Sequence, residues 1–241
     1  MIDRYDWAGG QEAMLRFGPL DGPVVVFAQP LFEEANRTRA LIVSVARALA
    51  RRRIASAIPD LPGTGESLVP TRDVTIMMMR EAFEGAAARF DREGRETYGA
   101  GIRSGALLDP LALLSGRWHL APVDGARVLR ELTRIKQIEV DHSLNEFWYL
   151  EGDTAIESGH SPVAIAGNLV SPHLLSELTA LTPFDQPDIP RRVVRLDSDP
   201  EPADVKLPGP PLWRRAEPDN DRALVELLAD DLTAWVRSCE G

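Results

Sequence analysis

The segment Gly101-Ile102-Arg103-Ser104-Gly105 has the glycine spacing of a G-x-S-x-G turn, in which a strand bends sharply into a helix. The middle residue of such a turn sits at the strained tip, where a serine acts as the nucleophile. Here the middle position holds Arg103, and the serine follows one place later as Ser104. Because an arginine stays protonated at any working pH, it cannot attack a carbonyl. The spacing therefore predicts a nucleophile turn whose nucleophile has been replaced.

Ser104 admits two interpretations. It could be a displaced nucleophile that uses His142 or His160 as its base. Alternatively, it belongs to the first helical turn with its hydroxyl directed away from the site, and the geometry of the turn favours this interpretation. Its backbone N–H is in the place that normally donates to an oxyanion. With a helix N-terminus below it and Arg103 beside it, this position suits a carboxylate, a phosphate or a sulfate.

The other members of a serine triad are incomplete in the sequence. In the order nucleophile, acid, histidine, the histidine follows the last strand. The last histidine of this chain is His173, which leaves 241 − 173 = 68 residues without one. Asp197 and Asp199 follow an apolar strand at 193–196, so an acid could remain without a base to orient. His119 lies in another apolar strand and is expected to be a hydrogen-bonded core residue.

Composition limits the classes of partner and site. The 241 residues, 44% of them hydrophobic, predict one α/β domain over 1–241. A net charge of −10 and a pI near 5.0 argue against nucleic acid or an anionic membrane as the main partner. The single cysteine, Cys239, and the spacing of the histidines predict no disulfide, no metal site and no cofactor. Because no signal segment or membrane-spanning apolar run is apparent, we expect a soluble, cytoplasmic protein.

Apolar runs alternate with amphipathic segments along the chain. This alternation predicts a mostly parallel sheet with helices on both faces. The expected strands are 12–18, 24–29, 55–59, 96–100, 117–122 and 192–197, and the expected helices are 36–53 (starting at an Asn36 N-cap), 74–92, 103–114, 125–138 and 219–236.

Residues 124–181 interrupt the alternation and are expected to form a small cap insertion over the carboxyl ends of the strands. This segment contains a strand-like stretch at 147–150 and an apolar run at 163–169. Its helix carries a basic stretch that we interpret as a solvated face, although it could attract an acidic partner or a polysaccharide. The stretch comprises Arg127, Arg130, Arg134 and Lys136.

Ordered sequence blocks resemble known families. Residues 60–67 (DLPGTGES) are similar to the D-x-x-G-x-G-x-S loop of the α/β-hydrolase superfamily. More narrowly, the chain resembles the exosortase A system-associated hydrolases in five blocks: 30–37 (PLFEEANR), 101–108 (GIRSGALL), 123–129 (VDGARVL), 166–175 (AGNLVSPHLL) and 211–213 (PLW). The resemblance implies an α/β-hydrolase fold in a bacterial protein linked to exopolysaccharide production and to the sorting of surface proteins.

The expected ligand site centres on Arg103. Glu33 and Glu34 fall where α/β-hydrolases place their second oxyanion loop, so one of them is predicted to hold the guanidinium. An unpaired buried charge would cost several kcal/mol. An anionic ligand would then compete with that glutamate. The predicted ligand-binding residues are Phe32, Glu33, Glu34, Arg103, Ser104 and Trp213.

Three classes of function follow from these observations. The leading hypothesis is an accessory protein that has lost the usual catalysis and binds an anionic small molecule or an acyl group at Arg103. The competing hypothesis is an active serine esterase or thioesterase that uses Ser104. The third is a module that binds a protein partner of the exopolysaccharide machinery through the cap surface.

Overall fold

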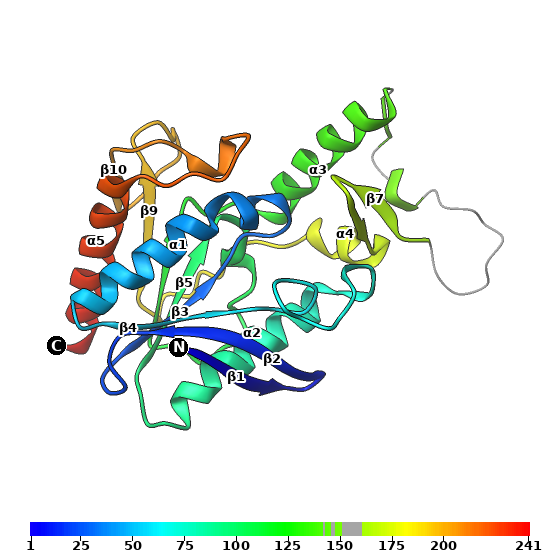
Figure 1. The fold of residues 1–241 in the computed structure, drawn as a ribbon. Coiled ribbons are helices and arrows are strands. Elements are labelled where there is room, and N and C mark those ends of the chain that lie inside the picture. Colours follow the sequence, from blue (N-terminus) through cyan, green and yellow to red (C-terminus); the bar gives the residue numbers. More distant parts are fainter. Residues whose placement is uncertain (142, 146–147, 151–160) are drawn as a thin grey trace.

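The computed structural model describes residues 1–141, 143–145, 148–150 and 161–241 (Figure 1). In these residues, one large sheet contains the eight strands β1 (Ile2–Trp7), β2 (Gly10–Phe17), β3 (Val24–Ala28), β4 (Ala55–Pro59), β5 (Thr97–Ile102), β6 (Gly116–Leu120), β9 (Arg191–Leu196) and β10 (Val205–Leu207). Their order is β1-β2-β4-β3-β5-β6-β9-β10. β2 runs antiparallel to both neighbours, and the pairs from β4 to β10 are all parallel. The predicted mostly parallel sheet is confirmed.

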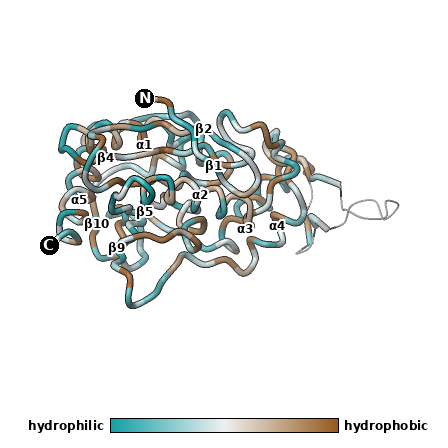
Figure 2. Tube along the Cα trace, turned by 90° about the horizontal axis from the view of Figure 1, so that it is seen from below, coloured by the Kyte–Doolittle hydropathy of each residue, from teal (hydrophilic) through white to brown (hydrophobic). Residues whose placement is uncertain are grey.

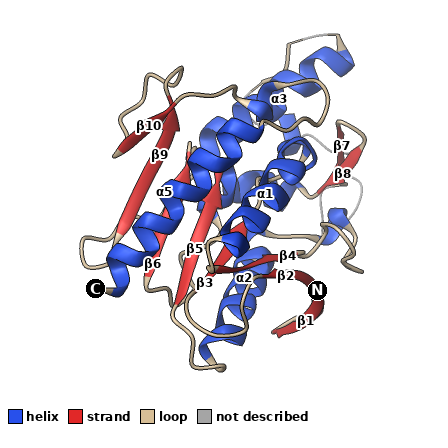
Figure 3. Ribbon diagram, turned by 60° about the vertical axis from the view of Figure 1, so that its left-hand side comes forward, coloured by secondary structure: helices blue, strands red, loops and turns tan. Residues whose placement is uncertain are grey.

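Helices cover both faces of the sheet. α1 (Glu33–Arg51) and α5 (Arg222–Glu240) lie together on one face, and α2 (Ile76–Asp91) covers the other (Figure 3). Because both faces are covered, β3, β4, β5 and β6 are buried along their whole length. The apolar layer under α1 and α5 includes Leu49 and Leu228, and the layer under α2 includes Phe83. These layers enclose β3 and β5, and the candidate site lies at the ends of these strands.

Between β6 and β9 the chain forms a separate group of elements, which we call the cap segment. It consists of α3 (Gly125–Val140), the 3-10 turn η3 (Trp148–Leu150), the antiparallel pair β7 (Val163–Ile165) and β8 (Asn168–Val170), and α4 (Pro172–Leu178). The cap segment stands beyond the edge where β5 ends, and α3 contacts the 3-10 stretch η2 (Arg103–Leu107) that follows β5 (Figure 1). This arrangement places one face of α3 over the turn at Arg103.

Local sequence signals explain where the cap helices begin. The Asp124 side chain accepts the backbone N–H of Arg127, and the Ser171 hydroxyl accepts that of His173. Pro172 occupies the first turn of α4, where its missing N–H costs nothing. Hydrophobic and hydrophilic residues are interleaved along α3 and α4, as expected of helices with one apolar face (Figure 2).

The predicted start of the first long helix is wrong by three residues. α1 begins at Glu33, after Phe32 with φ 57°, and Asn36 lies exposed inside the helix rather than at its N-cap. Glu33 and Glu34 therefore occupy the first turn, where the helix dipole favours negative charge. The positive φ of Phe32 turns the chain early into the helix.

The predicted helix over 103–114 is also wrong. Only the 3-10 stretch Arg103–Leu107 forms, followed by a turn in which Leu108 N–H donates to the Gly105 carbonyl. Pro110 follows closely and disfavours helical backbone at Asp109. Asp109 instead reaches into the core, where its carboxylate contacts His119 on β6.

Two further stretches differ from expectation. Trp148–Leu150 forms a 3-10 turn and not a strand, and its Trp148 indole N–H donates to the Thr133 hydroxyl of α3; residue 147 lies outside the described residues. The proline-rich loop at 200–211 contains the short strand β10 at the edge of the sheet. In both cases a tertiary contact overrides the local sequence preference.

Candidate functional site

The turn after β5 has the close packing of a nucleophile elbow. Arg103 at its tip has φ 55°, a left-handed conformation that is uncommon for a residue with a side chain. A Cβ atom on Gly101 would lie 2.7 Å from the Cα atom of Ala106, and one on Gly105 would lie 2.1 Å from the carbonyl oxygen of Ala28. Both flanking glycines are therefore required for the turn to close against η2 and β3, which explains the G-x-R-x-G spacing.

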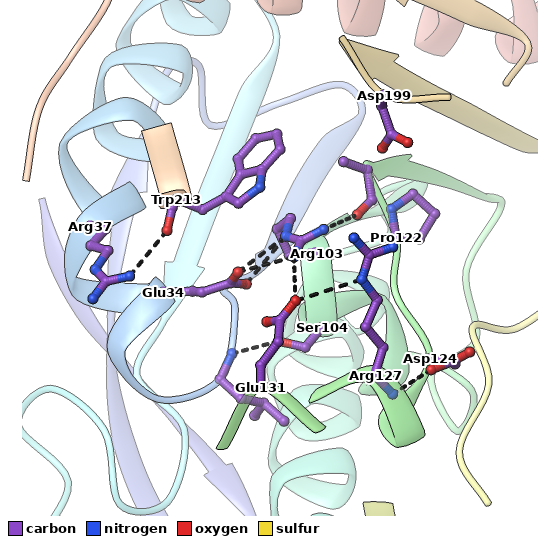
Figure 4. Close-up of polar contacts among 12 residues, drawn as sticks. Glu34, Arg37, Arg103, Ser104, Pro122, Asp124, Arg127, Glu131, Asp199 and Trp213 are labelled. Atoms are coloured by element: carbon purple, nitrogen blue, oxygen red, sulfur yellow. Dashed lines mark hydrogen bonds and ion pairs between the residues drawn. The ribbon is translucent and has the colours of Figure 1, made fainter. Parts of the chain in front are cut away.

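The Arg103 side chain is buried and bound on several sides (Figure 4). Its Nε lies 3.3 Å from both carboxylate oxygens of Glu34, and its Nη2 lies 3.1 Å from Glu34 Oε1. Nη1 donates to the Ala121 carbonyl at 3.2 Å, and the guanidinium carbon lies 5.1 Å from the centre of the Trp213 ring. The predicted pairing of Arg103 with a glutamate is confirmed for Glu34.

A second carboxylate extends this pair into a chain of alternating charges. Glu131 Oε1, on α3, lies 3.7 Å from Arg103 Nη2 and 3.6 Å from Arg127 Nε (Figure 4). The order Arg127–Glu131–Arg103–Glu34 therefore links the cap segment, the elbow and α1. Burial raises the pKa of Glu34 above its usual value, and Arg103 opposes this shift without cancelling it.

The hydroxyl of Ser104 is hydrogen-bonded to the backbone. Its Oγ is buried and accepts the backbone N–H of Leu31 at 2.9 Å. Leu31 belongs to the loop between β3 and α1, which in G-x-S-x-G enzymes supplies one of the two oxyanion donors. The Ser104 hydroxyl therefore accepts a backbone N–H from the loop that, in such an enzyme, donates to the substrate. This arrangement favours the interpretation of Ser104 as a structural residue.

Neither of the two histidines that the structure describes, His119 and His173, hydrogen-bonds to Ser104. His119 is fully buried, with Nε2 2.9 Å from Asp109 Oδ2, but its Nδ1 has no partner among the described residues. The expectation of a fully hydrogen-bonded core histidine is therefore only half right. His173 is exposed and lies 3.9 Å from Glu177. His142 and His160, the suggested alternative bases, lie outside the described residues.

The acid that follows β9 has an arginine as its partner. Asp199 Oδ2 lies 2.8 Å from Arg195 Nη1, and Asp199 Oδ1 accepts the Glu201 backbone N–H. Burial acts to raise the pKa of Asp199, but these two hydrogen bonds, together with the positive charges of Arg195 and Arg127, outweigh burial and hold the pKa below its usual value. The carboxylate thus braces the loop after β9, and no described histidine is oriented by it.

A cavity of about 1090 Å³ lies between the elbow and the cap segment. All six predicted ligand-binding residues line it, including Phe32 and Trp213. Glu33 lines it without a hydrogen bond or ion pair to any other described residue. Among the described lining residues, six arginines face three glutamates, although the chain as a whole has a net charge of −10. The cavity is therefore locally positive, which favours anions.

Sequence reasoning missed three charged residues of this cavity. Arg37 lies within the block 30–37, and Arg214 directly follows the block 211–213. Their place in or beside blocks that carry the resemblance was the signal that could have identified them. Glu131 lies within the helix that was interpreted as a solvated basic face. Arg130 and Arg134 are exposed, as expected of a solvated face, but both also line the cavity. Arg127 is half-buried and forms an ion pair with Glu131.

The described residues contain no group of three His, Cys, Asp or Glu side chains that could hold a metal ion. Within them, no helix has the length and apolar character needed to cross a membrane.

No protein-family model matches the chain, and no curated protein matches its sequence. Solved structures do match over nearly its whole length. The esterase Est1E from Butyrivibrio proteoclasticus matches with a TM-score of 0.61 and 16% identity, covering 99% of this chain and 98% of that one. The chain has the α/β-hydrolase fold. The same fold appears in a haloalkane dehalogenase variant from Bradyrhizobium elkanii (TM-score 0.61, 12% identity, 100% and 97% covered) and in a thermophilic esterase from Thermogutta terrifontis (TM-score 0.56, 14% identity, 100% of both chains covered).

Within the α/β-hydrolase fold, β5 leads into the nucleophile turn, and the loop after β3 faces it. Arg103 thus stands at the nucleophile position, as the G-x-R-x-G spacing predicts. The fold-level part of the sequence resemblance is confirmed by these neighbours.

Proposed function

We propose that this α/β-hydrolase-like protein binds a ligand with an anionic group in the cavity at Arg103 and does not act as a serine hydrolase. One observation carries the proposal: Arg103 stands at the nucleophile position, and Ser104 Oγ accepts a hydrogen bond from the Leu31 N–H. A serine hydrolase needs a free nucleophile and open oxyanion donors, and each contributes a large share of the rate. In this arrangement the serine hydroxyl is hydrogen-bonded away from the nucleophile position, and the Leu31 N–H, one of the two donors, is occupied.

In this proposal, the ion pair between Arg103 and Glu34 opens when the ligand binds. Glu34 satisfies Arg103 in the resting state, and an anionic ligand takes the place of its carboxylate. The exchange is made easier by the burial that raises the pKa of Glu34, because this carboxylate takes up a proton, and so releases Arg103, at a higher pH than an ordinary glutamate. Excess arginine around the cavity attracts the anion.

The biological setting follows from the sequence resemblance. The ordered blocks at 30–37, 101–108 and 166–175 support a role as an accessory protein of a bacterial exopolysaccharide and exosortase system. The first and third blocks contribute Phe32, Glu34 and Asn168 to the cavity, and the second contributes Arg103. The residues that carry the resemblance therefore cluster at the proposed site.

Two measurements on the purified protein test the proposal. We expect nitrophenyl butyrate turnover no faster than that of an unrelated protein, and we expect butanesulfonate, but not a butyl ammonium ion, to raise the unfolding temperature. Arg127→Gln should weaken this stabilisation, whereas Arg222→Gln, which removes an equal charge at an exposed position outside the cavity, should not. Ester turnover that disappears in a folded Ser104→Ala variant would instead establish the esterase or thioesterase function.

A further inference from the structure

The cavity at Arg103 is polarised along its length. The elbow side of the cavity holds the charged chain Arg127–Glu131–Arg103–Glu34, with Arg37 close by (Figure 4). Arg214 also lines the cavity. These groups come from α1, the elbow, the first half of α3 and the 3-10 turn η4 (Leu212–Arg214), which contacts α1. An anionic group is therefore accommodated at this end of the cavity.

Beyond the charged chain, the part of the cavity that α3 and the β7–β8 pair line is mainly apolar, and its polar members are the exposed Arg130 and Arg134 of α3 and Asn168 of β8. α3 contributes Val128, Leu132 and Ile135, which recur at helical spacing on one face, and Ile138 continues this row. The β7–β8 pair contributes Ile165 and Val170 on the other side. Its connecting turn is fixed to the end of α3, because the Ala166 N–H donates to Glu139 Oε1 at 2.7 Å. From residue 128 to residue 138, this apolar row extends roughly 15 Å along the helix.

Ile138 exposes most of its apolar surface to solvent. It lines the cavity, yet 82% of the side chain is exposed. A linear apolar chain that leaves the charged end and follows α3 would reach and cover Ile138.

We propose that the ligand is a single-chain amphiphile, in which a linear acyl or alkyl chain ends in a carboxylate or a phosphate. Its anionic group sits at the Arg103 end, and its chain lies along α3 between the helix and the β7–β8 pair. The inference rests on the proposed function and adds the ligand class and its orientation. A short anion lacks the chain that contacts Leu132, Ile135 and Ile138, and a neutral chain leaves the arginines without a partner.

Titration calorimetry with the full chain tests this orientation, using alkyl compounds below the concentrations at which they form micelles. Decanoate and decyl phosphate should both bind, and comparing them identifies which anionic group is preferred. Each added methylene should tighten binding about three- to fourfold from hexanoate to decanoate. Decanol and decyltrimethylammonium should bind at least tenfold more weakly.

A matched pair of variants locates the chain. Ile138→Asp places a charge on an exposed side chain that lines the cavity, so the fold should tolerate it. Gln137→Asp adds the same charge on the same helix, outside the cavity lining. We expect Ile138→Asp to weaken decanoate at least tenfold with little effect on acetate, and Gln137→Asp to leave both within twofold.

The outcomes separate this inference from the proposed function. If acetate and decanoate bind equally, or if Ile138→Asp and Gln137→Asp behave alike, the chain does not lie along α3 and the inference fails while anion binding stands. If no anion binds, both fail. If decanol binds as tightly as decanoate, the cavity selects for the chain alone, and the charged end has been assigned wrongly.

Discussion

The Ser104 hydroxyl accepts the backbone N–H of Leu31 at 2.9 Å, and this single bond joins the elbow to the loop between β3 and α1. Both groups are buried. In a serine hydrolase the N–H groups of these two segments bind the substrate oxygen. Here Ser104, next to the nucleophile position, accepts a hydrogen bond from the loop between β3 and α1. Arg103, at the nucleophile position, forms an ion pair with Glu34 in the first turn of α1. The same two segments that would build a catalytic site are tied to each other.

We expect Ser104→Ala to lower the free energy of unfolding by about 1–3 kcal/mol, because the buried Leu31 N–H would lose its acceptor. Chemical denaturation measures the change. Ser143→Ala, at an exposed position, serves as the control and should change stability by less than about 0.5 kcal/mol. A Ser104→Ala protein as stable as the parent would show that this bond does not hold the loop.

Removing one partner of the pair at the elbow should be more costly than removing both. We expect Arg103→Met to destabilise the protein by about 2–4 kcal/mol, since it leaves Glu34 largely buried and unpaired. The double variant Arg103→Met/Glu34→Leu should recover at least 1 kcal/mol of that loss. Equal stabilities of the single and double variants would mean that the two side chains are not coupled.

Anion binding should tighten as the pH falls. In the folded protein the pKa of Glu34 lies above its usual value of 4.5 because the carboxylate is buried. Protonation of Glu34 therefore begins at a higher pH than for an exposed glutamate and releases Arg103 for the ligand. An alkyl sulfonate, which stays ionised throughout, should bind more tightly as the pH drops through this window. Glu34→Gln should remove this pH dependence, and a variant that retained it would assign it to another group.

The same shift affects stability with a definite sign. Because the folded protein binds the Glu34 proton more tightly than the unfolded chain, stability falls as the pH rises from 4.5 through the raised pKa. The free energy of unfolding of the parent, measured relative to Glu34→Gln, should therefore decrease across that range. Denaturation at several pH values measures this difference, and an increase with pH would contradict the assigned direction.

A second buried cluster should contribute to stability rather than to binding. Asp109 Oδ2 lies 2.9 Å from His119 Nε2, and Asp109 Oδ1 lies 3.6 Å from Arg117 Nε, with all three side chains buried. We expect Asp109→Asn to cost about 2–4 kcal/mol, because Arg117 loses its nearest carboxylate. Asp185→Asn, which breaks an exposed pair with Arg191, should cost less than about 1 kcal/mol. Similar losses in the two variants would show that burial does not distinguish the pairs.

Much of the fold was predictable because its signals are local. The apolar strand at 24–29 and the N-caps at Asp124 and Ser171 specify elements through residues that are close in sequence. The position of Arg103 at the tip of the turn was predictable because two glycines at fixed spacing define the turn around it. The pairing with Glu34 then followed from the need to neutralise a buried charge.

The remaining features depend on tertiary contacts. The early start of α1 depends on the positive φ of Phe32, which has no signature in the residue type. Glu131 joins the site only because α3 packs over the elbow. Asp109 turns inward to meet His119 on β6, and this contact together with Pro110 replaces the expected helix. Such pairings are set by packing, and the periodicity of one segment cannot reveal them.

The side-chain Nε–H resonance of Arg103, followed by nitrogen-15 NMR, tests the central claim most directly. Its signal can be assigned by its loss in Arg103→Gln. Adding decanesulfonate should shift this resonance in step with ligand saturation, since the sulfonate replaces Glu34 at the guanidinium. A resonance that stays in place while the ligand saturates the protein would contradict anion binding at Arg103.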